Sequence, residues 1–179
     1  MNEHGVLAVI SGFSGAGKGT LMKALLEKYD NYALSISATT RNPREGEVDG
    51  REYFFVTEDR FKEMMEQGKD VLLEIEIQGA LKVKERFPEA ILIFVMPPNA
   101  EELKRRLIGR GTESMDVINA RLRRAVEEAE GMDSYDYILI NDEISSCTEQ
   151  LHKMIAVQHS RVSNNLAFLS QIREELKNI

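Results

Sequence analysis

Short apolar runs alternate with stretches of helical spacing along most of this chain. The runs predict strands over 6–11, 33–38, 52–56, 70–77, 90–96 and 136–141. Helices are predicted over 18–29, 58–67, 79–86, 99–108 and 115–131, with a long C-terminal helix from about 148. This alternation is typical of an α/β domain with three layers, in which helices flank a parallel sheet. Ligands of such sheets bind at the carboxyl ends of the strands, so we expect the site there.

Two further patterns concern burial. The runs 71–73, 91–95 and 137–140 are almost wholly apolar, which predicts strands buried on both faces. Six apolar residues near the C-terminus have the spacing of one helical stripe: Leu151, Ile155, Val162, Leu166, Leu169 and Leu176. This stripe predicts packing on the home domain, with a homodimer contact as the alternative.

Composition narrows the class of protein. The chain has 179 residues, which suits a single domain, and its net charge of −7 argues against general nucleic-acid binding. Cys147 is the one cysteine, so no internal disulfide is possible, and we expect it to be buried rather than nucleophilic. No apolar run approaches the length of a membrane span, and residues 1–5 lack the features of a signal peptide. These observations predict a cytoplasmic protein.

The first predicted strand runs directly into a glycine-rich turn with the spacing Gly12-x-x-x-x-Gly17-Lys18. Such a turn directs successive backbone N–H groups at an anion, and the helix that follows adds its positive end. Lys18 adds a full charge where the β- and γ-phosphates of a nucleotide would lie. The residues expected to bind ATP phosphates here are Ser14, Gly15, Ala16, Gly17, Lys18, Gly19 and Thr20.

One position departs from the general pattern. The residue after the lysine is Gly19, where a Ser or Thr hydroxyl usually binds Mg²⁺, and a hydroxyl comes only at Thr20. Any Mg²⁺ must then be held mainly by water and nucleotide phosphates. This favours a small nucleotide kinase over a GTPase switch or a motor ATPase.

A second polar cluster follows the next predicted strand. Arg41 and Arg44 lie in a turn shaped by Pro43 and Gly46, and two guanidinium groups suit one phosphate. Tyr53 could offer its hydroxyl to the same phosphate. The alternative is a solvated polar loop with a core tyrosine. Together with the first turn, the cluster indicates a donor and an acceptor site.

Five segments in order resemble guanylate kinase: 12–20, 37–53, 73–79, 106–112 and 140–142. The resemblance covers roughly residues 5–155 and implies a P-loop NTPase fold. It also implies transfer of the γ-phosphate of ATP to GMP, with Mg²⁺. No general base is implied, because the attacking phosphate oxygen of GMP is already ionised, and the three histidines therefore receive no role.

The resemblance assigns roles by position. It implies that GMP is bound by Ser37, Arg41, Arg44, Tyr53 and Glu74, the last of these on the guanine ring. Glu76 would lie near Mg²⁺, through water, at the end of the same strand. Arg106 and Asn141 would lie on ATP, the latter near adenine. The residues implied in catalysis are Lys18, Arg41, Arg44, Arg110 and Arg121, of which the last two belong to a lid with Arg106.

The resemblance also divides the single domain of residues 1–179. The core would comprise 1–32, 70–105 and 125–179, the GMP-binding subdomain 33–69, and a helical lid 106–124. The subdomain appears truncated, because family members have roughly 25 more residues between the positions matching Gln67 and Gly68. Those residues normally complete the guanine site.

Three explanations of the short subdomain are open. The residues belong to the protein although this sequence omits them, they were deleted by engineering, or the chain is naturally short. We expect the first, because every flanking motif is intact. Alternatives to an active guanylate kinase are also open. The first is a binding module that keeps the fold without catalysis, or an impaired kinase. The second is a kinase for another nucleoside monophosphate.

Overall fold

The computed structural model of the chain describes residues 4–36, 58–109 and 114–179. Its centre is a five-stranded sheet in the order β2-β3-β1-β4-β5, in which every pair is parallel. The strands are β1 (Leu7–Gly12), β2 (Tyr32–Ile36), β3 (Asp70–Glu74), β4 (Ile91–Met96) and β5 (Tyr137–Ile140). The three-layer α/β fold expected from the alternating pattern is therefore confirmed.

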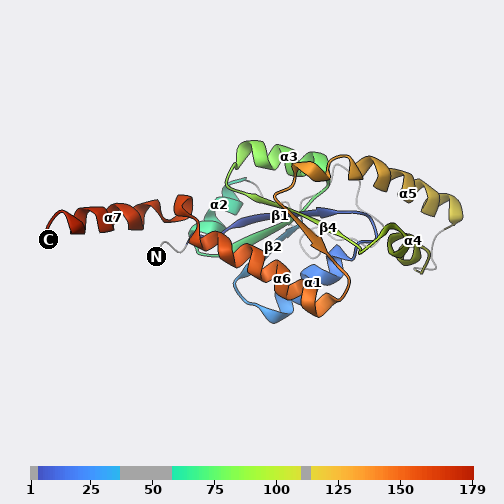
Figure 1. Cartoon of the computed structure of the whole chain (residues 1–179), viewed down its shortest axis with the longest axis horizontal. Coiled ribbons are helices and arrows are strands. Elements are labelled where there is room, and N and C mark those ends of the chain that lie inside the picture. Colours follow the sequence, from blue (N-terminus) through green and yellow to red (C-terminus); the bar gives the residue numbers. More distant parts are fainter. Residues whose placement is uncertain (1–3, 37–57, 110–113) are drawn as a thin grey trace.

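Helices cover both faces of the sheet (Figure 1). They are α1 (Lys18–Lys28), α2 (Glu58–Glu66), α3 (Ile77–Arg86), α4 (Ala100–Gly109), α5 (Met115–Ala129), α6 (Ile144–Ala156) and α7 (Leu166–Leu176). Short 3-10 turns occur at Met132–Ser134, Val157–Ser160 and Val162–Asn165. Among the described residues no helix is both long and apolar enough to cross a membrane.

Two apolar clusters hold the layers together. On one face Leu21 and Leu25 of α1 pack with Leu151 of α6 against the sheet. On the other face Ala80 and Phe87, from α3 and the residue after it, pack against strands β1, β3 and β4. Full burial of one such leucine stabilises the fold by about 1.5–3 kcal/mol. The clusters fix β1 at the centre, and with it the glycine-rich turn at its carboxyl end.

Burial confirms the expectation for β3 and β4 but not for β5. Residues 71–73 and 91–95 are buried, as predicted. In β5 only Leu139 is buried, whereas Ile138 and Ile140 are 55% and 48% exposed. The prediction that 137–140 is covered on both faces was wrong because β5 is an edge strand.

The predicted single C-terminal helix from 148 is also wrong. α6 begins at Ile144, and two 3-10 turns separate it from α7. The break lies at Arg161, whose backbone is extended with ψ 139°. Leu151 and Ile155 are buried in the core, whereas Val162, Leu166 and Leu176 are exposed, so the six apolar residues do not form one stripe. α7 projects away from the sheet (Figure 1).

Side chains at the amino end of the sheet contact the residues that precede α7. The Asp70 carboxylate accepts a hydrogen bond from the Val6 backbone N–H at 2.8 Å and lies 2.8 Å from His159 Nε2. His152 stacks on the ring of Tyr29 with centroids 3.8 Å apart. Both histidines therefore have packing roles far from the turn.

The connection between α2 and β3 contains the junction between Gln67 and Gly68, where the resemblance predicts that residues are missing. Gly68 has a φ of 79°, and its N–H donates to the Met65 carbonyl at 2.9 Å. The next N–H, of Lys69, donates to the Met64 carbonyl at 3.0 Å. This pair of bonds is the Schellman ending of a helix. The core sheet therefore closes without further residues here.

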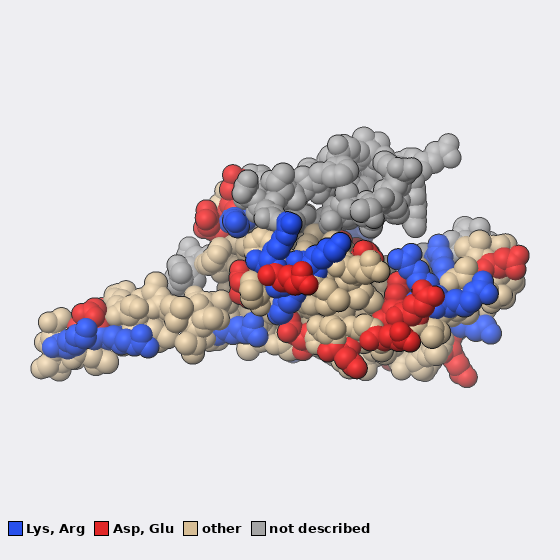
Figure 2. Space-filling view, turned by 90° about the horizontal axis from the view of Figure 1, so that it is seen from above, with Lys and Arg blue, Asp and Glu red and all other residues tan. Residues whose placement is uncertain are grey.

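The charged side chains are mixed rather than sorted by sign. Figure 2 shows lysine, arginine, aspartate and glutamate side chains next to one another on the face that it presents. Cys147 is buried, and burial raises the pKa of its thiol to about 11, against a lowering effect of Arg106. The expectation that Cys147 is no nucleophile agrees with this.

Candidate functional site

The turn between β1 and α1 has the conformation that a phosphate-binding loop needs. Gly12, Gly15 and Gly17 all have positive φ values, of 151°, 91° and 87°. A Cβ on Gly12 would lie 2.0 Å from the Val95 carbonyl oxygen, and one on Gly17 would lie 2.5 Å from Asn141 Nδ2. Neighbouring groups therefore exclude any side chain at these two positions, and the loop keeps its N–H groups directed inward.

A cavity of about 240 Å³ opens beside this loop. It is lined by Ser14, Gly15, Gly17, Lys18, Gly19, Thr20, Glu74 and Arg121. The structure thus brings together predicted residues from three places in the chain: the turn, the end of β3 and helix α5. Ala16 is fully buried behind the loop rather than in the cavity wall.

Lys18 is the first residue of α1 and turns back along the loop. Its Nζ donates hydrogen bonds to the carbonyl oxygens of Gly12 at 2.7 Å and Phe13 at 3.2 Å. These contacts keep the ammonium group at the mouth of the loop. The helix N-terminus adds positive potential at the same place, so the cavity favours an anion.

Glu74 is the acidic member of the cavity wall. Partial burial at the end of β3 raises the pKa of its carboxyl group, and the positive charge of Lys18 opposes that rise. The net rise means that the folded protein disfavours the ionised form. A carboxylate held at such a position in a cavity has the character of a functional group rather than a stabilising one.

The raised pKa of Glu74 leads to a pH-dependent prediction. Between its ordinary pKa of 4.5 and its folded value, the folded state binds more protons than the unfolded state, so stability falls as pH rises through that window. Glu74→Gln removes this dependence. Thermal melts should show Glu74→Gln gaining stability over the wild type as pH rises from about 4 to about 7.5. A constant or shrinking difference would contradict the assignment.

Arg121 reaches the loop from helix α5, and Arg106 reaches it from α4. Arg121 NH1 donates to Ser14 Oγ at 3.4 Å. Arg106 NH1 lies 3.5 Å from the Ala16 carbonyl oxygen, a long hydrogen bond. Asn141, which follows β5, is buried and donates from Nδ2 to the same Ala16 oxygen at 2.8 Å. Two residues predicted on ATP, Arg106 and Asn141, and one predicted in the catalytic lid, Arg121, thus lie against the phosphate loop.

Other predicted residues are placed elsewhere or lie outside the described residues. β3 ends at Glu74, so the expectation that Glu76 ends the same strand was wrong. Glu76 instead precedes α3 as its N-cap, is exposed, and does not line the cavity. The predictions for Ser37, Arg41, Arg44, Tyr53 and Arg110 fall outside the described residues.

Two polar residues near the loop were not singled out from the sequence. Ser11 is buried at the end of β1, and its Oγ donates to the Ile75 carbonyl at 2.7 Å, which joins β1 to the end of β3. Glu102 binds Arg105 and Arg106 from one turn earlier on α4. Its spacing of three and four residues from two arginines was a signal that could have found it.

Comparison with known proteins gives a consistent result. The family model for guanylate kinase matches in two parts, over residues 5–67 and 61–158. A guanylate kinase of Caldanaerobacter subterraneus subsp. tengcongensis is 45% identical over 202 residues, with 98% of each chain covered. One of Lactococcus lactis subsp. lactis is 43% identical, covering 90% of this chain and 92% of the relative.

A solved structure agrees with the sequence comparisons. The guanylate kinase of Anaplasma phagocytophilum superposes with a TM-score of 0.68 at 27% identity, and 93% of each chain is covered. The parallel sheet with its phosphate loop is thus the P-loop NTPase fold that the resemblance implied. The match by sequence extends over nearly the whole chain and includes every described part of the cavity wall. The chain belongs to the guanylate kinase family.

Proposed function

We propose that this protein is an ATP:GMP phosphotransferase, which converts ATP and GMP to ADP and GDP. The observation that carries the proposal is the cavity where the phosphate loop, Lys18 and Arg121 meet, in a chain of the guanylate kinase family. A phosphate oxygen of GMP forms a bond to the γ-phosphorus of ATP, and the bond to the β,γ-bridging oxygen breaks. ADP leaves with that oxygen.

The residues on the donor side have the chemistry that this transfer needs. Loop N–H groups and Lys18 neutralise charge on the β- and γ-phosphates, and Arg121 adds charge from helix α5. Arg106 and Arg110 are proposed to complete this set from the lid, residues 106–124. The buried Oδ1 of Asn141 has no hydrogen-bond partner among the described residues, which supports its proposed place near the amino group of adenine.

On the acceptor side we propose Ser37, Arg41, Arg44 and Tyr53 for the GMP phosphate, within a subdomain of residues 33–69. Glu74 is proposed to accept hydrogen bonds from the guanine ring. Guanine presents adjacent N–H donors at N1 and N2, which a carboxylate suits. Because Glu74 lies beside Lys18, a guanine ring bound to Glu74 would lie close to the transferring phosphate.

The cavity suits Mg²⁺ bound together with ATP. It offers the hydroxyls of Ser14 and Thr20 beside the phosphate loop, and no cluster of three or more acidic, His or Cys ligands occurs within the described ranges. Mg²⁺ usually keeps several waters and binds substrate phosphates rather than an all-protein cage, so this donor set fits. Mg²⁺ would supply charge neutralisation on the phosphates. Contact through water with Glu76 remains a prediction.

Three observations support a short GMP-binding subdomain. The family model breaks into two parts that meet between residues 61 and 67. The 202-residue alignment with the Caldanaerobacter enzyme exceeds the 179 residues of this chain by 23, so at least that many positions have no residue here. The core closes across the junction with ordinary helix-ending geometry. The missing residues therefore concern GMP binding rather than folding of the core.

The affinity for GMP should depend on these residues. A protein whose intact mass is 20.3 kDa lacks them, and we expect weak GMP binding with ATP binding retained. A protein heavier by about 3 kDa, or about 25 residues, contains them, and we expect ordinary tight binding. Intact mass spectrometry combined with calorimetric titration of GMP checks this. Tight GMP binding by the 20.3 kDa chain would contradict it.

The function itself is tested by ADP release. We expect ADP to be released from ATP only when GMP is added, in an amount equal to the GDP formed. ATP binding without GMP-dependent release would instead identify a binding module, which the sequence comparisons do not favour.

Three predictions from the sequence stay predictions. A cytoplasmic location and the lack of nucleic-acid partners rest on composition. For the homodimer, α7 offers a candidate face: it has no buried residue, and an isolated helix of 11 residues is marginal in water. Sedimentation velocity measures whether the chain is dimeric.

A further inference from the structure

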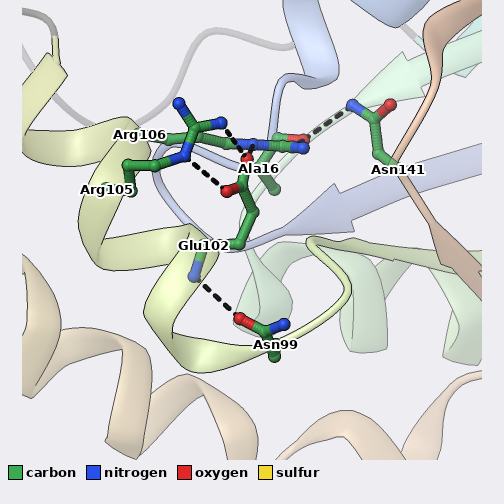
Figure 3. Close-up of polar contacts among 6 residues, drawn as sticks. All are labelled: Ala16, Asn99, Glu102, Arg105, Arg106 and Asn141. Atoms are coloured by element: carbon green, nitrogen blue, oxygen red, sulfur yellow. Dashed lines mark hydrogen bonds and ion pairs between the residues drawn. The ribbon is translucent and has the colours of Figure 1, made fainter.

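The Ala16 carbonyl oxygen joins three elements at the back of the phosphate loop (Figure 3). Asn141 donates to it from the residue after β5 at 2.8 Å, and Arg106 NH1 approaches it from α4 at 3.5 Å. Ala16 is fully buried, so its carbonyl depends on these donors for satisfaction. Arg106 therefore lies against the back of the loop through a long hydrogen bond, beside the shorter one from Asn141.

Arg106 is in turn held by Glu102, one helical turn earlier. Glu102 Oε1 accepts from Arg106 Nε at 2.6 Å, and its two oxygens accept from Arg105 Nε and NH2 at 2.6 Å. The carboxylate is sheltered, with a side chain 17% exposed, whereas that of Arg105 is 75% exposed. Hydrogen bonds from Arg105 and then Arg106 lower the pKa of Glu102 to about 2. The Glu102 carboxylate is therefore ionised at neutral pH.

The hydrogen bond to Glu102 sets which edge of the Arg106 guanidinium faces the loop. Because Nε is bound to the carboxylate, NH1 is directed to Ala16. The backbone N–H of Glu102 donates to Asn99 Oδ1 at 2.8 Å, which fixes the first turn of α4 (Figure 3). Glu102 is thus placed by one contact and places Arg106 by another.

We propose that Glu102 is a positioning residue, which aims Arg106 at the phosphate loop so that the guanidinium is in place before ATP binds. The proposal rests on the proposed function for its consequence in catalysis. A long arginine side chain loses considerable conformational freedom when it binds, and a preset orientation removes part of that loss. Charge-assisted hydrogen bonds of this kind are the strong ones in proteins.

A purely structural role for Glu102 gives different expectations. Pairs three and four residues apart stabilise an exposed helix only slightly, whichever arginine is involved. In that case, removal of either arginine partner would have the same small effect, and ATP binding would not change. A positioning role and a purely structural role therefore predict different ATP affinities for a Glu102 variant, and only a positioning role makes the effect depend on Arg106.

A double-mutant cycle on the full chain tests the proposal, with ATP affinity measured by calorimetry and kcat and KM for ATP by ADP release. We expect Glu102→Gln alone to weaken ATP binding by about 10-fold, in line with the loss of one charge-assisted bond. In the Arg106→Ala background the same change should have less than about a 2-fold effect. Coupling of this size is expected because Glu102 acts through Arg106.

Two control variants keep the result interpretable. Arg105→Gln removes the other, exposed partner of Glu102, and Glu101→Gln removes the neighbouring exposed carboxylate on the same helical turn. Both should leave ATP affinity and kcat at wild-type values, and thermal melts report whether each variant is folded. Independent effects of Glu102→Gln and Arg106→Ala, or an equal loss in Arg105→Gln, would overturn the proposal.

The calorimetric arm does not need phosphoryl transfer. If the unaltered protein binds ATP but shows no GMP-dependent ADP release, the proposed function fails while the cycle on ATP affinity still decides the role of Glu102. If release is normal and the cycle shows no coupling, only the role of Glu102 fails.

Discussion

Replacing Lys18 with methionine is expected to lower kcat by about a thousandfold, because the variant keeps the length of the side chain and removes its charge. The ammonium group lies at the mouth of the phosphate loop, 2.7 Å from the Gly12 carbonyl oxygen. In the transition state, negative charge spreads over the oxygens of the transferring group, which Lys18 would neutralise. ADP release at saturating ATP and GMP measures the loss.

A lysine on the same helix provides the control. Lys23 is exposed and pairs with Glu27 on the solvent side of α1 at 3.8 Å. Lys23→Met should leave kcat unchanged, because an exposed pair of this kind contributes little. A loss of less than about tenfold in Lys18→Met, with the protein folded, would contradict the role given to Lys18.

Replacing Arg121 with glutamine is expected to lower kcat by about a hundredfold or more, with a smaller rise in KM for ATP. Arg121 lines the same cavity as Lys18 and comes within 3.4 Å of Ser14 Oγ. A charge that acts mainly on the transition state lowers kcat more than it weakens ATP binding. Steady-state kinetics with both substrates varied separate the two effects.

The comparison variant is Arg123→Gln, on the same helix. Arg123 is exposed, and it does not line the cavity. Its replacement should leave both kcat and KM at wild-type values. If Arg121→Gln raised KM for ATP and left kcat unchanged, Arg121 would serve ground-state binding and not the transfer itself.

The alternating pattern predicted the fold well because each buried strand had its own apolar run. The pattern gave a wrong prediction where the burial of a strand depends on the elements beside it. Ile138 and Ile140 have the composition of central residues, but β5 has no strand beyond it. Strand order depends on contacts between segments far apart in the chain, which local composition does not contain.

The C-terminal region failed for a similar reason. Apolar spacing continues across Arg161, so the pattern predicted one helix, whereas the backbone turns there. Gln158 is buried, and its side chain donates to Tyr137 Oη at 3.1 Å and to the Met154 carbonyl at 2.8 Å. A buried polar contact of this kind holds the chain in 3-10 turns and overrides helical spacing.

The phosphate loop was predictable because its chemistry lies within nine consecutive residues. The contact of Asn141 with Ala16 joins positions 125 residues apart, and only the motif order indicated that they belong to one site. Glu76 was misplaced by a small error, since the strand ends at Glu74, three residues before its predicted end at 77. The contribution of Glu102 depends on where Arg106 lies, which the fold alone decides.

The most direct test of the account is a coupled assay of ADP release with GMP, AMP, UMP and CMP as acceptors, each at several millimolar so that weak binding is also detected. We expect ADP release with GMP at a rate at least about a hundredfold above the other three, because Glu74 would pair with the N–H edge of guanine and lose that pairing with other bases. Preference for another base would contradict the guanine assignment. Release with none of the four, by folded protein that binds ATP, would contradict the proposed phosphotransfer.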